Sequence, residues 1–93
     1  MKLRFTPEAL QHIAGIQFYI EPHSQQAAKR AAQKIYAAAD MLSAFPEIGR
    51  TGMVPGTYEL AVPKLPYILV HELDHAESEI IIIAVFHGAQ SRA

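Results

Sequence analysis

The chain has 93 residues, enough for one hydrophobic core but not for two, so we expect one domain spanning residues 1–93. A content of 51% hydrophobic and 18% charged residues excludes a disordered chain, and the absence of cysteine excludes disulfides and thiolate metal sites. The formal net charge of −1 gives no general attraction to nucleic acid. The longest apolar run, residues 80–86, is too short to span a membrane, and the N-terminus has no apolar stretch of signal-peptide length. We therefore expect a cytoplasmic protein that does not enter a membrane.

The first predicted elements are a strand and a helix. Residues 2–5 (KLRF) alternate polar and apolar side chains, as a strand does. Thr6 and Pro7 then form a helix start, with a hydroxyl N-cap before a proline at the first helical position. The pattern predicts a helix from about Pro7 to Ile20, ended by Pro22. Its apolar face consists of Ala9, Ile13, Ile16 and Ile20.

A second, longer helix follows after a short connection. Ser24 is its predicted N-cap, and the helix extends over about residues 25–44. Many residues on its apolar face are alanines, which would let the two helices approach closely as an antiparallel hairpin. Residues 46–57 contain three glycines and two prolines, so we expect this whole segment to be loop. The glycines are expected to be turn residues with positive φ: Gly49, Gly52 and Gly56.

The last third of the chain is typical of β-structure. Residues 58–62 alternate, residues 67–73 are rich in β-branched and aromatic side chains, and residues 79–87 form a nearly continuous apolar run. We expect the last run to be the buried central strand of the sheet. The element order predicts a small α+β domain, β-α-α-β-β-β, with a helical hairpin packed on one face of a mostly antiparallel sheet.

The sequence HELDH at 71–75 matches the H-E-x-x-H zinc signature, but the match is expected to be accidental. In the metalloproteases the two histidines are one helical turn apart, about 5–6 Å between Cβ atoms, and reach the same zinc ion. Here His71 lies within the predicted strand at 67–73, where four residues extend over about 13 Å. His75 is expected in the following turn. We therefore expect no metal site at His71, Glu72 and His75.

A series of short motifs follows the second helix in a fixed order. They are P-x-x-G-R at 46–50, P-G-T-x-E-L at 55–60, P-Y-x-L-V at 66–70 and H-G-A-Q-x-R at 87–92. In this order and spacing they resemble the ParE branch of the RelE/ParE toxins of type II toxin–antitoxin systems. The upstream residues 27–50 fit the same family, so the resemblance covers nearly the whole chain.

The resemblance implies a RelE/ParE-like fold and a toxin held inactive by a cognate antitoxin. Such antitoxins typically lay a flexible C-terminal segment over the toxin, and the pair often represses its own promoter, so operator DNA is contacted only through the antitoxin. ParE-like members are regarded as poisons of DNA gyrase, whereas RelE-like members cut messenger RNA in the ribosomal A site. We expect the antitoxin to cover the outer helix face or the edge of the first strand.

Arg50, in the glycine-rich loop, is a candidate for binding the target. Its planar guanidinium could contact a phosphate or an acidic protein surface. It could equally cap the C-terminal carbonyl groups of the second helix. Glu59 could pair with Arg50 or Lys64 and order the loop, or it could lie at a solvated edge.

Three further candidates belong to the last two motifs. Tyr67 begins a strand and is expected in the core with its hydroxyl at the rim. His87 could be a hydrogen-bonded cap of its strand, but it occupies the histidine of H-G-A-Q, where the resemblance implies the functional end of the toxin. Arg92 is the one basic residue after Lys64, in a terminal segment that by default is frayed. The target-binding set is thus Arg50, His87 and Arg92.

The charge distribution favours a toxin that acts by binding and is not an enzyme, and no cofactor is expected. RNA cleavage requires an acid, a base and concentrated positive charge, which here could come from Arg50, Tyr67, His87 and Arg92. Glu72 stands where many relatives carry a basic residue, and Tyr58 where many ParE-like members have arginine. We therefore expect inhibition of gyrase by binding, with ribosome-dependent mRNA cleavage or an attenuated toxin that only binds its antitoxin as alternatives. This expectation rests on the acidic second half of the chain, which after residue 50 has Lys64 and Arg92 against Glu59, Glu72, Asp74, Glu77 and Glu79.

Overall fold

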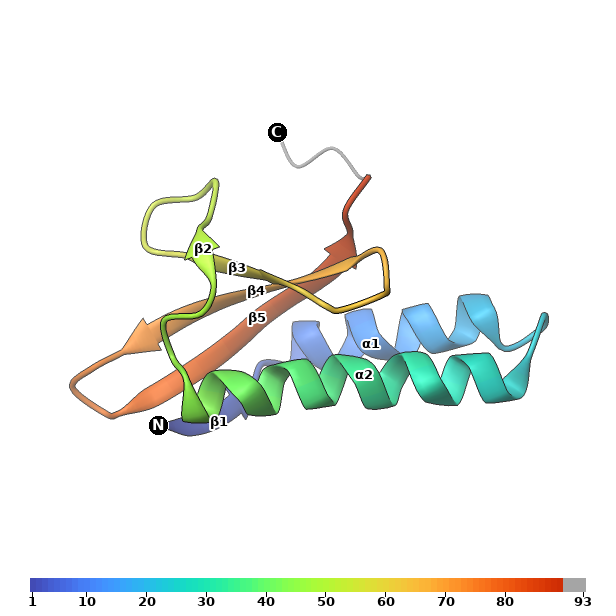
Figure 1. Ribbon diagram of the computed structural model, residues 1–93, viewed down its shortest axis with the longest axis horizontal. Coiled ribbons are helices and arrows are strands. Elements are labelled where there is room, and N and C mark those ends of the chain that lie inside the picture. Colours follow the sequence, from blue (N-terminus) through green and yellow to red (C-terminus); the bar gives the residue numbers. More distant parts are fainter. Residues whose placement is uncertain (90–93) are drawn as a thin grey trace.

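Two helices cover one face of a five-stranded sheet in the computed structural model, which describes residues 1–89 (Figure 1). This arrangement confirms the predicted α+β class with a helical hairpin on a mostly antiparallel sheet. Neither helix is both long and apolar enough to cross a membrane. The elements are β1 (Lys2–Phe5), α1 (Pro7–Ile20), α2 (Gln25–Ala44), β2 (Arg50–Thr51), β3 (Tyr58–Ala61), β4 (Tyr67–Asp74) and β5 (Glu79–His87).

Both helices begin at the predicted caps. The Thr6 hydroxyl oxygen accepts the Ala9 N–H at 3.1 Å, and the Ser24 hydroxyl oxygen accepts the Ala27 N–H at 3.0 Å. The Thr6 hydroxyl also lies 3.3 Å from the carbonyl oxygen of Ile82, to which it can donate. Thr6 therefore caps α1 and also links the start of this helix to the middle of β5.

The helices form the antiparallel hairpin that the alanines of α2 predict (Figure 1). The buried side of α2 is made mainly of small residues, and α1 buries Ala9 and Ile13 against it and the sheet. Beneath them, Leu69, Ile80 and Ile82 form the sheet side of the core with no exposed surface. The buried residues of α2 are Ala28, Ala31, Ala32, Ile35, Ala38, Ala39 and Leu42.

The strand order in the sheet is β1-β5-β4-β3-β2. β1 runs parallel to β5, and every other neighbouring pair is antiparallel. β5 was expected to be the central strand; it is an interior strand, but β4 occupies the middle of the sheet. The correction follows from β2, because this additional strand lengthens the sheet on the side away from β5.

The loop prediction for residues 46–57 is wrong at Arg50 and Thr51, which form β2 by pairing with Glu59 and Tyr58. Two glycines of this segment also serve a different purpose from the one expected. Gly56 has positive φ (85°), but Gly49 and Gly52 do not. They allow close approach instead: a Cβ on Gly49 would lie 2.9 Å from the Glu59 carbonyl oxygen, and one on Gly52 would collide with the Thr57 hydroxyl.

The two faces of the sheet differ. Directly paired residues share a face, and the helix-covered face holds the row Leu60, Leu69 and Val85. The other face, which we call the open face, has no helix of the described residues 1–89 over it (Figure 1). Its paired rows along the middle strands are Ile68 with Phe86, Val70 with Ala84 and Glu72 with Ile81.

Candidate functional site

The structure separates Arg50 from His87, two residues of the predicted target-binding set. The row of paired residues that starts at Arg50 runs through Glu59 and Val70 to Ala84, three residues before His87. From strand spacing and rise, the two backbones are about 17 Å apart. Arg50 lies on the open face, whereas His87 is paired with the core residue Tyr67, so the two side chains do not form one site. Arg92, the third member, lies outside the described residues.

Arg50 is held at the sheet edge by Glu59. Its Nη2 lies 3.5 Å from Glu59 Oε1, which confirms the pairing alternative and excludes the solvated-edge alternative, because Glu59 is only 5% exposed. The second carboxylate oxygen accepts the N–H of Met53 at 3.4 Å. The Arg50 side chain itself is 72% exposed, so most of its guanidinium is accessible to a partner.

Tyr67 and His87 lie side by side at the far end of the sheet. Their ring centroids are 5.8 Å apart at an interplanar angle of 85°, an edge-to-face contact. Tyr67 is buried, as predicted, and His87 Nδ1 accepts the N–H of Ala89 at 3.1 Å, as a strand cap would. The following Gly88 N–H donates to the Pro66 carbonyl oxygen at 2.6 Å, which fixes the chain as it leaves β5.

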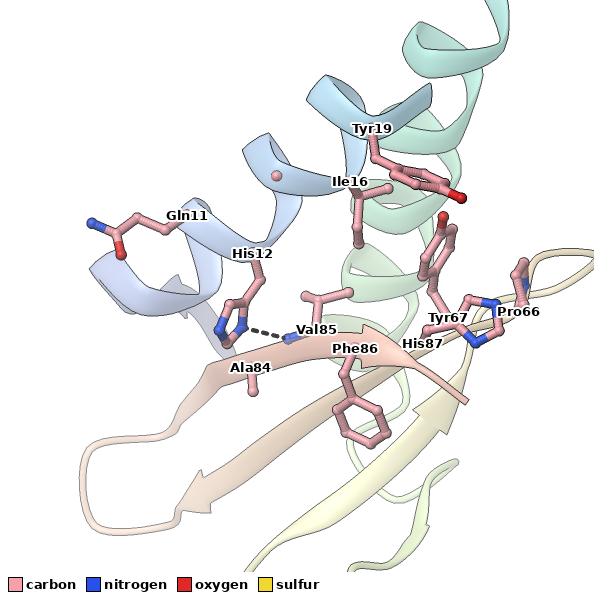
Figure 2. Close-up of a pocket in the computed structure, with 11 residues that line it drawn as sticks. Gln11, His12, Ile16, Tyr19, Pro66, Tyr67, Ala84, Val85, Phe86 and His87 are labelled. Atoms are coloured by element: carbon pink, nitrogen blue, oxygen red, sulfur yellow. Dashed lines mark hydrogen bonds between the residues drawn. The ribbon is translucent and has the colours of Figure 1, made fainter. Parts of the chain in front are cut away.

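An open groove of about 840 Å³ lies between α1 and the end of β5 and includes this pair (Figure 2). Figure 2 shows the Tyr19 ring of α1 facing the Tyr67 ring across the open end of the groove. The groove wall is mainly apolar and aromatic, and among residues 1–89 no lysine, arginine or carboxylate belongs to it. Its lining residues outside the pair are Gln11, His12, Gly15, Ile16, Tyr19, Pro66, Ala84, Val85 and Phe86.

Sequence reasoning missed the role of His12. β1 pairs with β5 only as far as Ile82, so within the described part of the chain no strand pairs with the next stretch of β5 on that side. There the Val85 N–H donates to His12 Nδ1 at 3.2 Å, as Figure 2 shows. The imidazole thus replaces the missing strand as hydrogen-bond acceptor. The signal would have been the unpaired N–H at the edge of β5, and the sequence does not reveal how β1 is aligned along β5.

The HELDH residues have the extended shape expected from the sequence. His71 to Asp74 are the end of β4, and His75 is in the turn that follows. His71 has no exposed surface, whereas His75 is exposed. Over residues 1–89, no three His, Cys, Asp or Glu side chains are grouped so that they could hold a metal ion.

His71 is instead a buried core residue, which the sequence did not indicate. Its ring stacks on Tyr58, with centroids 5.8 Å apart and an interplanar angle of 27°. Neither ring nitrogen has a hydrogen-bond partner within the described part of the chain. Burial lowers the pKa of His71, because the charged imidazolium is poorly solvated there.

The open face combines an apolar middle with mixed charge. Arg50 pairs with Glu59, and at the opposite edge Arg4 Nε lies 3.2 Å from Glu79 Oε1. Over residues 1–89, positive and negative charges on this face are therefore interspersed and include two ion pairs, and they do not form a basic surface. The charged side chains on this face, from the strand register, are Lys2, Arg4 and Arg50 against Glu59, Glu72, Asp74 and Glu79.

Comparison with known proteins identifies the fold and the family. The family model described as "ParE toxin of type II toxin-antitoxin system, parDE" matches residues 3–92. "Putative toxin Y4kP" of Sinorhizobium fredii (strain NBRC 101917 / NGR234) is 33% identical over 89 residues, 96% of this chain and 90% of that protein.

Solved structures share the fold at lower identity. A chain of the chromosomal ParDE system of P. aeruginosa has a TM-score of 0.81 at 24% identity, covering 94% of this chain and 95% of the other. A chain of the Mycobacterium tuberculosis RelBE2 complex has a TM-score of 0.70 at 20% identity, covering 92% and 95%. For the intact E. coli RelBE complex the TM-score is 0.62 at 16% identity, covering 97% and 98%. The chain belongs to the ParE toxin family of type II toxin–antitoxin systems.

Proposed function

We propose that this toxin acts by binding a protein target, DNA gyrase, and that it does not cut RNA. The observation that carries the binding mechanism is the charge pattern of the open face. Cleavage of a phosphodiester requires several cations around the developing negative charge of the transition state. On this face the cations are matched by carboxylates, and Arg4 and Arg50 are each already paired with one. Gyrase as the target rests on the resemblance to the ParE-like branch.

The apolar middle of the open face also supports a protein target. Phe86 and Ala84 point away from α1, toward the uncovered side of the sheet (Figure 2). With Ile68 and Val70 they form a half-buried apolar strip. A fully hydrated phosphate backbone gains little from such a strip, whereas a protein interface has an apolar centre with a polar rim.

One observation favours the second candidate, an mRNA endonuclease of the RelE type. The imidazole of His87 and the phenol of Tyr67 are in contact and could act as a general acid–base pair. The groove beside them holds no cation among the described residues. A nuclease would therefore have to obtain its phosphate-binding charge from Arg92 or from the ribosome.

A cognate antitoxin is the second proposed partner, and α1 offers it exposed apolar side chains. Phe18 is 80% exposed, and Leu10 lies two helical turns before it on the same side of the helix. Tyr19 is also largely exposed at the mouth of the groove. An amphipathic segment of the antitoxin would bury these side chains. β1 lies at a sheet edge and is the alternative docking position.

Pulse-labelling distinguishes the two candidate targets. The toxin is induced without antitoxin in a bacterial host, and incorporation of labelled thymidine and methionine is followed over the first minutes. A gyrase poison should lower DNA synthesis first while translation continues. An early fall in translation would instead favour the endonuclease, and co-expression of the antitoxin should restore both.

A further inference from the structure

The loop between β2 and β3 presents two large apolar side chains to solvent. Met53 is 62% exposed and Val54 is 63% exposed, and Pro55 beside them is exposed as well. Figure 1 shows this loop projecting beyond the sheet, away from the helical layer. Loop tips in soluble proteins are usually small and polar, so an apolar tip needs an explanation.

The tip is fixed by short internal hydrogen bonds around Thr57. The Gly52 N–H donates to the Thr57 carbonyl oxygen at 2.8 Å, and the Thr57 N–H donates to the Val54 carbonyl oxygen at 3.1 Å. The Thr57 hydroxyl donates to the same Val54 oxygen at 2.6 Å. Thr57 is buried, and Gly56 supplies the positive φ that closes the turn. The backbone that carries Met53 and Val54 is therefore ordered before any partner arrives.

The base of the loop is joined to Arg50 through Glu59. The buried carboxylate holds the Met53 N–H on one oxygen and the Arg50 guanidinium on the other. An exposed guanidinium is thereby placed next to an exposed apolar tip in a defined arrangement. Methionine and arginine are both enriched in protein interfaces, and ordering in advance removes part of the entropic cost of binding.

We propose that Met53, Val54 and Arg50 form the contact through which this toxin binds its protein target. The complementary surface is an apolar pocket of the target, with a carboxylate at the rim that meets the guanidinium of Arg50. The inference rests on the proposed function only in that the toxin acts by binding a protein. It does not require that protein to be gyrase.

This contact lies away from the surfaces proposed for the antitoxin. β2 and β1 are the two opposite edges of the sheet, and α1 packs beside β5. Mutations in the loop and in α1 should therefore separate toxicity from neutralisation. That separation is the basis of the test.

The test compares Met53→Ser/Val54→Thr with the control Phe18→Ser, each in the full chain. All three side chains are exposed, so both variants should keep the thermal midpoint of the wild type. For the loop variant, we expect the inducer concentration that halves growth to rise about tenfold or more, with antitoxin affinity unchanged. Phe18→Ser should keep its toxicity and lose antitoxin affinity. Arg50→Gln should also reduce toxicity, as the loop variant does.

Three results would overturn the inference. The first is a loop variant that is folded and fully toxic. The second is a parallel loss of antitoxin affinity, which would assign the loop to the antitoxin. The third is a wild-type dimer that the loop variant dissociates, which would assign the loop to a second copy of the chain.

A supercoiling assay with purified gyrase separates this inference from the proposed target. If the wild type inhibits gyrase and the loop variant inhibits it equally, the loop inference fails and the target stands. If the wild type leaves gyrase active while the loop variant still loses toxicity, gyrase fails and the loop inference stands.

Discussion

The β2–β3 edge of the sheet and the groove beside the end of β5 hold their functional side chains in different ways. At the β2–β3 edge, a buried carboxylate fixes Arg50 and the Met53 backbone, and Gly49 packs with no room for a side chain. At the other end, Tyr67 and His87 meet through ring packing in an open groove whose mouth is lined by the exposed Tyr19. The edge is built to hold one geometry, whereas the groove tolerates change. Mutations at the edge should therefore cost more stability than mutations in the groove.

The largest effect is expected from Gly49→Ala. Its Cβ would lie 2.9 Å from the backbone oxygen of Glu59 and 2.9 Å from His71 Cε1, so the strand pair or the buried ring must shift. Such overpacking costs about 1–3 kcal/mol, which lowers the thermal midpoint by roughly 5–15 °C in a domain of this size. The control is Gly15→Ala on α1, where nothing lies within 4 Å of the new Cβ. It should raise stability by about 0.5–1 kcal/mol. Equal midpoints for the two variants would contradict the close contact at Gly49.

Glu59→Gln tests the carboxylate that organises the edge. The amide keeps the shape but loses the charge that binds Arg50 and Met53, so we expect a loss of about 1–2 kcal/mol in urea unfolding. Glu72→Gln is the matched control, because Glu72 is exposed on the same face, and it should change stability by less than about 0.5 kcal/mol. If both variants unfold at the same urea concentration, Glu59 does not stabilise this edge.

The buried His71 makes the free energy of unfolding depend on pH. Burial lowers the pKa of His71 in the folded state, so below about pH 6.5 the unfolded chain binds a proton that the folded chain does not. Stability should therefore be full above pH 6.5 and fall as the pH drops toward the folded-state pKa, by at most about 1.4 kcal/mol per pH unit. Urea unfolding at pH 7.5 and pH 5.5 measures the change. The His71→Leu variant should lack this component and His75→Gln should retain it; the opposite result would refute the assignment.

The smallest effect is expected from His12→Ala in the groove. The variant leaves the Val85 N–H without its imidazole acceptor, but His12 is exposed, so water can replace it. We expect a loss of about 0.5 kcal/mol, and faster hydrogen exchange at the Val85 amide. Gln11→Ala on the same helix should leave that exchange rate unchanged. A loss of stability as large as that of Gly49→Ala would contradict the expectation that the groove tolerates mutation better than the β2–β3 edge.

Local signals predicted the secondary structure well. The two helix starts depend on neighbouring residues, Thr6-Pro7 and Ser24, and the structure has both caps where the sequence predicts them. The motifs at 46–60 and 66–92 were sufficient to indicate the family that the comparisons identify. What the sequence could not supply depends on pairing between distant residues. β2 exists only because Arg50 and Thr51 meet β3, and the buried His71 ring lies against Gly49 and Tyr58, both distant in the sequence.

The candidate site was predicted only in parts for the same reason. Tyr67 was correctly placed in the core, and the Arg50–Glu59 pair was one of the alternatives considered. Arg50 and His87 lie on different faces of the sheet, and this could not be predicted because it depends on the strand register. The apolar tip at Met53 and Val54 was not recognised, since apolar residues in a loop indicate exposure only once the hydrogen bonds of the loop are known.

Inhibition of gyrase by this toxin is tested most directly with purified components. The toxin is added in increasing amounts to gyrase with relaxed plasmid, and in parallel to translating ribosomes with a defined messenger RNA. We expect supercoiling to be inhibited while the messenger RNA stays intact, and excess antitoxin to restore supercoiling. Cleavage of the messenger RNA with gyrase fully active would contradict this expectation, and would mean that the His87–Tyr67 pair works as a catalytic site despite the balanced charge of the sheet.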